Sequence, residues 1–187
     1  MKIGAIIGSL REHSYNRVLF EKTREMFPDD IDMIEIRIDD IPLMNQDYEY
    51  PAPESVDRLR EEFQEMDAIW IFTPEHNHSY SAALKNVIDW LSRPVERGGE
   101  DVLSGKLITY SGVGFGLSGT TSAQDELAKL LGFLDTELMN YPRVTVGSLG
   151  SLLDENGVWI PDEMTVKFIQ YQIDAFLKFV EKRKACL

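Results

Sequence analysis

The stretch KIGAIIGSLREHSYN, residues 2–16, sets an apolar run directly before a small polar loop. An apolar run without alternation is typical of a strand that is buried on both faces, as strands of parallel sheets are. Gly8 lets the backbone turn tightly where the run ends. Ser14 then stands where the N-cap of a helix belongs, and Asn16 falls in the first turn of that helix.

The polar loop at residues 8–16 has two interpretations. It can be a solvated turn with an ordinary helix cap and a surface arginine. It can also hold an anion such as a phosphate, because hydroxyls, exposed amides and the positive end of the helix dipole attract negative charge. The guanidinium of Arg11 adds a positive charge with bidentate geometry. The sequences of the other loops distinguish between these two interpretations.

Strand and helix patterns alternate along the whole chain. Extended segments are expected at residues 2–8, 31–38, 67–73, 106–112, 136–141 and 143–147, and helices at residues 14–27, 54–66, 80–92, 122–134 and 161–184. This alternation indicates βαβ units with right-handed crossovers. The second extended segment places Ile34, Ile36 and Ile38 on one face, and such alternation suits an exposed edge strand.

These patterns predict one α/β domain over residues 1–187. We expect a flavodoxin-like three-layer sandwich with a five-stranded parallel sheet of order 2-1-3-4-5. Ligands of such sheets bind at the carboxyl ends of the strands, where the strand order reverses. The loops expected to meet there are residues 8–15, 74–80 and 111–121.

The composition restricts the possible partners. The net charge is −13, and an acidic surface repels nucleic acid and anionic lipid, so neither is expected as a partner. No apolar run has the length needed to cross a bilayer, and the first run reads as a strand, so we expect no membrane association and a cytoplasmic location. The single cysteine, Cys186, excludes an intramolecular disulfide and a cysteine-held iron–sulfur cluster within one chain.

The loop at residues 74–80 begins with Pro74, which restricts the backbone after the strand. Asn77 and Ser79 are expected to cap the helix that follows. The loop is either a well-capped connection or the lining of a flat heteroaromatic ring. His76 and His78 are too few for a metal site, so no metal is expected. An acid–base pair of a neighbouring glutamate with His76 is a lesser alternative.

The loop at residues 111–121 contains Gly114, Gly116 and Gly119 in the spacing G-x-G-x-x-G. This pattern is a weak sign of dinucleotide binding here, because it follows the third buried strand and not the first βα unit. We expect a flexible loop that lets a planar ligand approach the backbone. The alternative is a loop whose glycines serve only to adopt positive φ angles.

Taken together, these loops resemble those of the NADPH-dependent FMN reductase family, over roughly residues 2–180. The family's phosphate loop G-S-x-R-x-x-S-x-N is matched at every position within residues 8–16. Its segment P-E-Y-N-x-S is matched at residues 74–79 except that His76 replaces the tyrosine. The helix motif L-K-N-x-I-D-W with S-R-P is matched within residues 84–94, and PLMNQD at 42–47 is similar to a loop near the family's active site.

The resemblance implies a bound FMN and NADPH or NADH as co-substrate. The cofactor-binding residues it implies are Ser9, Arg11, Ser14, Tyr15, Asn16, Pro74, Glu75, His76, Asn77, Ser79, Ser111, Gly112, Val113 and Gly114. The loop at 111–121 is less rich in paired glycines than is usual in the family. It places Val113 and Phe115 near the expected ring, while His76 bears on the choice of acceptor if its side chain contacts the flavin.

The implied activity is that of an NAD(P)H oxidoreductase, which passes electrons through FMN to a small acceptor such as a quinone, free flavin, chromate or an azo compound. No side chain is needed as nucleophile or base, so no catalytic residue is expected. One alternative is a flavodoxin-like electron carrier that serves a protein partner, and another is a flavin-binding sensor without turnover. The resemblance also implies a homodimer or homotetramer. Trp90, off the apolar stripe of its helix, then either lies at a subunit contact or packs under a neighbouring loop.

Overall fold

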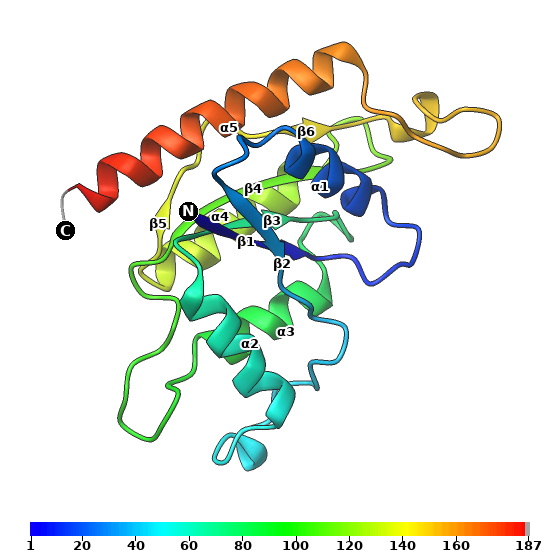
Figure 1. The fold of residues 1–187 in the computed structure, drawn as a ribbon. Coiled ribbons are helices and arrows are strands. Elements are labelled where there is room, and N and C mark those ends of the chain that lie inside the picture. Colours follow the sequence, from blue (N-terminus) through cyan, green and yellow to red (C-terminus); the bar gives the residue numbers. More distant parts are fainter. Residues whose placement is uncertain (186–187) are drawn as a thin grey trace.

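The apolar run at the start of the chain forms a central strand of a parallel sheet (Figure 1). The computed structural model describes residues 1–185, so Cys186 lies outside the described residues. The strands are β1 (Lys2–Ile7), β2 (Asp32–Glu35), β3 (Ala68–Phe72), β4 (Leu107–Val113), β5 (Glu137–Leu138) and β6 (Thr145–Val146). The α-helices are α1 (Tyr15–Glu25), α2 (Glu54–Glu65), α3 (Ala82–Leu91), α4 (Thr121–Phe133) and α5 (Glu163–Lys184), and short 3-10 turns occupy Gln46–Tyr48 and Leu149–Ser151.

The sheet has the predicted order, β2-β1-β3-β4-β5, with every pair parallel. It has six strands and not five, because two short strands share the position beside β4. β5 pairs with Leu107 and Ile108 near the start of β4, and β6 pairs with Gly112 and Val113 at its end. The flavodoxin-like α/β fold is therefore confirmed, with a divided last strand.

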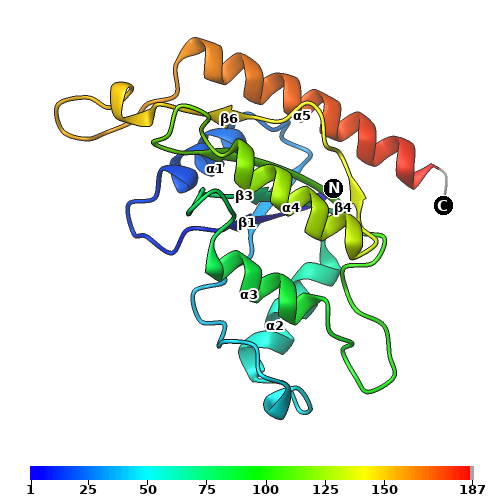
Figure 2. The ribbon, with the colours of Figure 1, turned by 180° about the vertical axis from the view of Figure 1, so that it is seen from behind.

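Helices cover the two faces of the sheet, as Figures 1 and 2 show from opposite sides, and an apolar layer lies between the sheet and the helices on each face. One layer joins α1 and α5 to the sheet around Trp70, whose ring stacks on Phe72 and meets Phe176 edge-on at a centroid distance of 5.4 Å. The other layer joins α2, α3 and α4 to side chains on the opposite face, including Ile69 and Ile71. Strands β1 and β3 are buried on both faces, which explains their unbroken apolar sequences.

The edge strand β2 is shorter than predicted and ends at Glu35. Ile36 and Ile38 are buried, whereas Ile34, predicted on the same face, is 39% exposed. A strand at the edge of a sheet has no neighbour on its outer side, which leaves such a side chain open to solvent. Met33, on the opposite face of β2, is buried in the layer that contains α1 and α5.

Trp90 is fully buried, and its indole N–H donates to the Pro42 carbonyl at 2.8 Å. Asn86 on the same helix accepts from the Met44 N–H at 2.7 Å and donates to the Pro42 carbonyl at 2.9 Å. Helix α3 therefore holds the loop that precedes α2. Trp90 packs beneath that loop, and its alternative reading as a subunit contact is wrong.

Within residues 1–185, no helix combines the length and the apolar character needed to span a bilayer.

Candidate functional site

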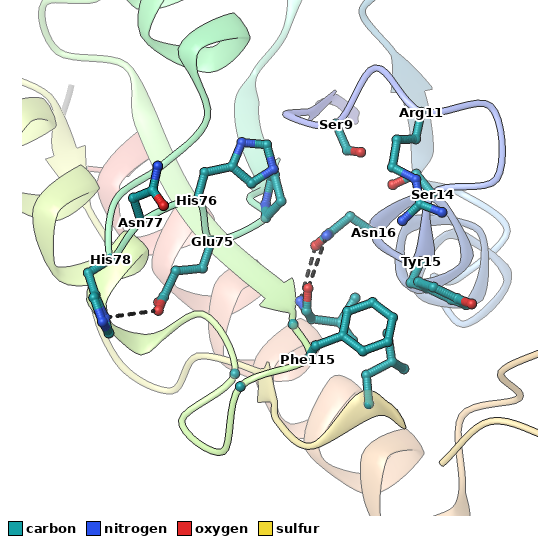
Figure 3. Close-up of a pocket in the computed structure, with 16 residues that line it drawn as sticks. Ser9, Arg11, Ser14, Tyr15, Asn16, Glu75, His76, Asn77, His78 and Phe115 are labelled. Carbon is teal, nitrogen blue, oxygen red and sulfur yellow. Dashed lines mark hydrogen bonds and ion pairs between the residues drawn. The ribbon is translucent and has the colours of Figure 1, made fainter. Parts of the chain in front are cut away.

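The loops that follow β1, β3 and β4 meet at one edge of the sheet and enclose a cavity of about 430 Å³ (Figure 3). They meet there because the strands are parallel, so their carboxyl ends lie at the same edge. The cavity is lined by Ser9, Arg11, Ser14, Tyr15, Asn16, Pro74, Glu75, His76, Asn77, His78, Val113, Gly114, Phe115, Gly116, Gly119 and Leu149.

Ser14 lies at the start of α1 with extended backbone angles, as an N-cap residue does. Its side chain, however, makes no capping hydrogen bond, and the residue is only 3% exposed. Its hydroxyl oxygen is buried without a hydrogen-bond partner among the described residues. A buried hydroxyl without a partner costs free energy. Because Ser14 lines the cavity, a ligand there can supply the missing partner.

The surroundings of Ser14 favour an anionic group. No acidic side chain lies in the first turn of α1, so the positive end of the helix dipole is not neutralised from within the helix. Arg11 is exposed, lines the cavity and lies over the Tyr15 ring at 5.9 Å. Figure 3 shows Ser9, Arg11 and Ser14 gathered at the same end of the cavity. This end has the donors that a phosphate requires.

Asn16 lines the cavity too, but its amide is already engaged. Its Nδ2 donates to the Val113 carbonyl at 3.1 Å, and its Oδ1 accepts from the Val113 N–H at 3.1 Å. The residue is buried, and both bonds lie in the interior of the protein. Asn16 therefore positions the start of α1 against the end of β4, and its side chain is not free to bind an anion.

The loop after β3 is a tight turn closed by two backbone bonds. The His76 N–H donates to the Ser79 carbonyl at 2.8 Å, and the Ser79 N–H donates to the His76 carbonyl at 3.0 Å. Asn77 and His78, at the tip, have φ angles of 53° and 61°. Asparagine adopts this left-handed region more readily than most residues, which suits it to the turn.

The predicted caps of α3 are wrong. Ser81 is the N-cap residue, and its hydroxyl accepts from the Leu84 N–H at 3.2 Å and donates to the Gly8 carbonyl. This arrangement ties the loop after β3 to the loop after β1. Asn77 and Ser79 belong instead to the preceding turn.

Glu75 anchors the same turn to α4. Its Oε2 accepts from the Ala123 N–H at 3.1 Å, which places a carboxylate at the positive end of that helix, and its Oε1 lies 3.5 Å from His78 Nδ1. The Ser122 hydroxyl lies 3.5 Å from the same His78 nitrogen. One ring nitrogen cannot link both partners in a proton relay, so these residues do not form a hydrolase triad.

The loop after β4 forms the remaining wall. Phe115 meets the Tyr15 ring edge-on at a centroid distance of 5.8 Å, and both rings line the cavity. Gly119 has φ +62°, and a Cβ there would lie 2.7 Å from the Val146 carbonyl oxygen. A Cβ at Gly114 would lie 2.8 Å from the Gly119 carbonyl oxygen. These two glycines let the loop pack against its own backbone, whereas Gly116 faces open space.

Three residues of the predicted site do not line this cavity. Ser79 is half-buried in the turn described above. Ser111 is buried on the face of the sheet that α5 covers, where its hydroxyl accepts from the Trp70 indole N–H at 2.9 Å and donates to Gln172 Oε1 at 2.9 Å. At Gly112 a Cβ would lie 2.2 Å from the Thr73 carbonyl oxygen, so this glycine permits close packing of neighbouring backbones.

Five residues that line the cavity are absent from the implied cofactor-binding residues: His78, Phe115, Gly116, Gly119 and Leu149. Of these, Phe115 was expected near the ring. His78 and the glycines stand in segments already singled out, so their positions in those loops were a usable signal. Leu149 lies in a short 3-10 turn after β6, and no local pattern connects it to the site.

The cavity thus has two chemically different ends. Hydroxyls, Arg11 and the start of α1 make one end suitable for a phosphate. The turn at His76 and Asn77 and the backbone of residues 113–116, together with Phe115, make the other suitable for a planar group with polar edges (Figure 3). Within the described part of the chain, no group of three His, Cys, Asp or Glu side chains is placed to hold a metal ion.

Comparisons with known proteins find relatives that match nearly the full chain. A family model described as NADPH-dependent FMN reductase matches residues 1–149. A 2-hydroxy-1,4-benzoquinone reductase of Burkholderia sp is 34% identical over 98% of this chain and 98% of its own length. An NAD(P)H-dependent FMN reductase of Pseudomonas aeruginosa is 36% identical over 97% of this chain and 96% of its own length. The solved structure of the flavoenzyme NAD(P)H:(acceptor) oxidoreductase FerB from Paracoccus denitrificans superposes with a TM-score of 0.86, at 32% identity, over 97% of this chain and 98% of that one.

Proposed function

The chain belongs to the NADPH-dependent FMN reductase family, and from this premise we propose how its cavity serves that activity. The enzyme is an FMN-dependent NAD(P)H oxidoreductase that passes electrons to a small acceptor such as a quinone. FMN binds in the cavity with its phosphate at Ser9, Arg11 and Ser14 and its ring between the turn at His76 and the backbone after β4.

One observation carries the placement of the phosphate. The Ser14 hydroxyl is buried and has no partner among the described residues, yet it lines a cavity. A phosphate oxygen beside it would accept its hydrogen bond and remove the cost of burying it unpaired. Arg11 would add the charge that an acidic protein of net charge −13 does not supply from its general surface.

At the other end the protein contributes shape. Asn16 fixes the end of β4, and Glu75 fixes the turn after β3, so the two walls that face the ring are held in place from behind. Tyr15 and Phe115 shield the cavity on one side. Bound FMN supplies the redox chemistry itself. None of the lining side chains is assigned a role as nucleophile or base.

The named relatives favour a small acceptor over a protein partner. A benzoquinone reductase and an NAD(P)H-dependent FMN reductase match nearly the full chain, and neither name describes an electron carrier. These two relatives are the reason for preferring a reductase with a small acceptor over a flavodoxin-like electron carrier. Assembly as a homodimer or homotetramer and a cytoplasmic location remain predictions from the family resemblance and the composition.

An absorption spectrum tests the proposed function. The purified protein is mixed with FMN, and NADPH is added without oxygen, before and after a quinone is supplied. We expect flavin bands that bleach on addition of NADPH and return with the quinone. Flavin that binds but stays oxidised contradicts the reductase activity and supports a carrier or sensor. The absence of any bound flavin contradicts the assignment of the cavity.

A further inference from the structure

A second cavity, of about 600 Å³, lies beside the first, between α1 and the turn at residues 154–159. It is lined by Arg11, Glu12, His13, Ser14, Tyr15, Arg17, Val18, Glu21, Asn156, Gly157, Val158 and Trp159. Its volume is within the range of sites for small organic ligands. The proposed placement of FMN makes no use of this space.

The two cavities share only the residues at the phosphate end. Arg11, Ser14 and Tyr15 line both, whereas the turn at His76 and the backbone after β4 line only the first. A group in the second cavity is therefore adjacent to the phosphate and remote from the ring. If it belongs to the same ligand as the ring, it must be joined to it through the phosphate.

We infer that the second cavity takes the adenylate group of FAD, so that the protein accepts FAD as well as FMN. This inference rests on the proposed position of the flavin phosphate at Ser14. FAD is FMN extended at its phosphate by an adenylate. Such a ligand would pass from the first cavity to the second at its phosphates, beside the residues that line both cavities. The buried, unpartnered Ser14 hydroxyl then faces the junction between the two halves of the ligand.

The lining of the second cavity suits such a group. Arg11 supplies positive charge beside the second phosphate. The guanidinium of Arg17 is paired with both oxygens of the Glu35 carboxylate at 2.7 Å, so Arg17 offers its remaining N–H groups but little net charge. Glu21 offers carboxylate oxygens to ribose hydroxyls, the role that an acidic residue has in dinucleotide folds. Val158 offers an exposed apolar surface to the base.

The acidic residues in the lining limit the affinity. Glu12 and Glu21 both line the cavity, so they oppose the attraction between Arg11 and a second phosphate. We therefore expect FAD to bind about as tightly as FMN and not far more tightly.

The outer wall of this cavity is ordered before a ligand arrives. Asp154 Oδ1 accepts from the N–H groups of Asn156 at 2.9 Å and Val158 at 2.8 Å, which closes a compact turn. The Tyr15 hydroxyl donates to the Gly157 carbonyl at 2.9 Å and joins this turn to α1. A preformed wall reduces the entropy lost on binding.

Fluorescence titrations of the full-length chain, freed of bound flavin, test the inference with FMN and FAD. Val158→Glu places a negative charge in the second cavity and keeps both backbone bonds of that residue with Asp154. For the unaltered protein we expect the two Kd values to agree within about tenfold. Val158→Glu should raise the Kd for FAD by about tenfold or more and change that for FMN by less than about twofold.

Val95→Glu is the matched control, because Val95 is another exposed valine and lines neither cavity. It should leave both affinities unchanged, and thermal melting of each variant reports folding. The inference is overturned if FAD binds the unaltered protein about a hundredfold more weakly than FMN, or if Val158→Glu weakens both flavins equally. It is also overturned if that variant raises the KM for NADPH with FAD affinity intact, since the cavity would then hold the adenylate of the nicotinamide. Failure of both flavins to bind would overturn the proposed function itself.

Discussion

Asn16 and Val113 exchange two hydrogen bonds of 3.1 Å, although they are 97 residues apart in the chain. The side-chain amide of Asn16 satisfies both the carbonyl and the N–H of Val113, where β4 ends. The pair holds the start of α1 and the loop after β4 in a fixed relation. These segments form adjoining walls of the cavity proposed to bind the flavin, so we expect stability and cofactor binding to be coupled at this contact.

Asn16→Asp tests this coupling. The aspartate carboxylate has the shape of the amide and can still accept from the Val113 N–H, but it has no N–H group to donate to the Val113 carbonyl. The Val113 carbonyl would lose its partner in a buried position, and we expect the free energy of unfolding to fall by about 1–3 kcal/mol. The affinity for FMN should fall as well. Urea unfolding and a flavin titration measure the two effects. Gln46→Glu, the same chemical change on an exposed side chain, should have little effect on either.

Ser14→Ala should separate binding from stability. The hydroxyl has no partner among the described residues, so its removal should not lower the free energy of unfolding of the flavin-free protein. Loss of its bond to the phosphate should raise the Kd for FMN by about tenfold or more. Riboflavin is the control ligand because it lacks the phosphate, and its affinity should not change. An equal loss for both ligands would show that Ser14 does not contact the phosphate.

Gly119→Ala should destabilise the protein, whereas Gly116→Ala should not. Gly119 has φ +62°, and a Cβ there would lie 2.7 Å from both the Thr145 hydroxyl and the Val146 carbonyl oxygen. The strain and the contact together should cost about 1–3 kcal/mol. Gly116 stands in the same loop and has no atom near the position of an added Cβ. Chemical denaturation compares the pair, and equal stabilities would contradict the packing described for this loop.

Glu49 should contribute to the acid sensitivity of the fold. The Arg93 guanidinium donates to its Oε1 at 2.6 Å and lowers the pKa of Glu49 below its ordinary value of 4.5. A carboxyl whose folded pKa is lowered stabilises the protein above its unfolded pKa, and this stability is lost as the pH falls through the folded pKa. In Glu49→Gln, the free energy of unfolding should therefore fall less steeply as the pH decreases below about pH 4.5. Asp47→Asn, on an exposed residue of the same loop, is the control.

Several features of the protein could be predicted because they depend on neighbouring residues in the chain. The apolar runs of β1 and β3, the helical spacing between them and the small polar loop at residues 8–16 are local patterns. Their alternation leads to the strand order, because crossovers between parallel strands have one hand. Parallel strands in turn bring the three loops to one edge of the sheet, so the position of the cavity followed from the sequence.

Other features depend on contacts between segments far apart in the chain. The sequence left Trp90 between a subunit contact and an internal position, and burial beneath Pro42 decided the matter. Ser111 and Asn16 stood in the predicted site, but distant partners engage their side chains. The second cavity exists only because the turn at residues 154–159 folds back onto α1. The sequence alone determined which elements form and which loops meet at one edge of the sheet, since both follow from local periodicity and chain chirality. Only the tertiary structure decided which polar groups stay free for a ligand, because a hydrogen bond between remote residues is made when the elements dock.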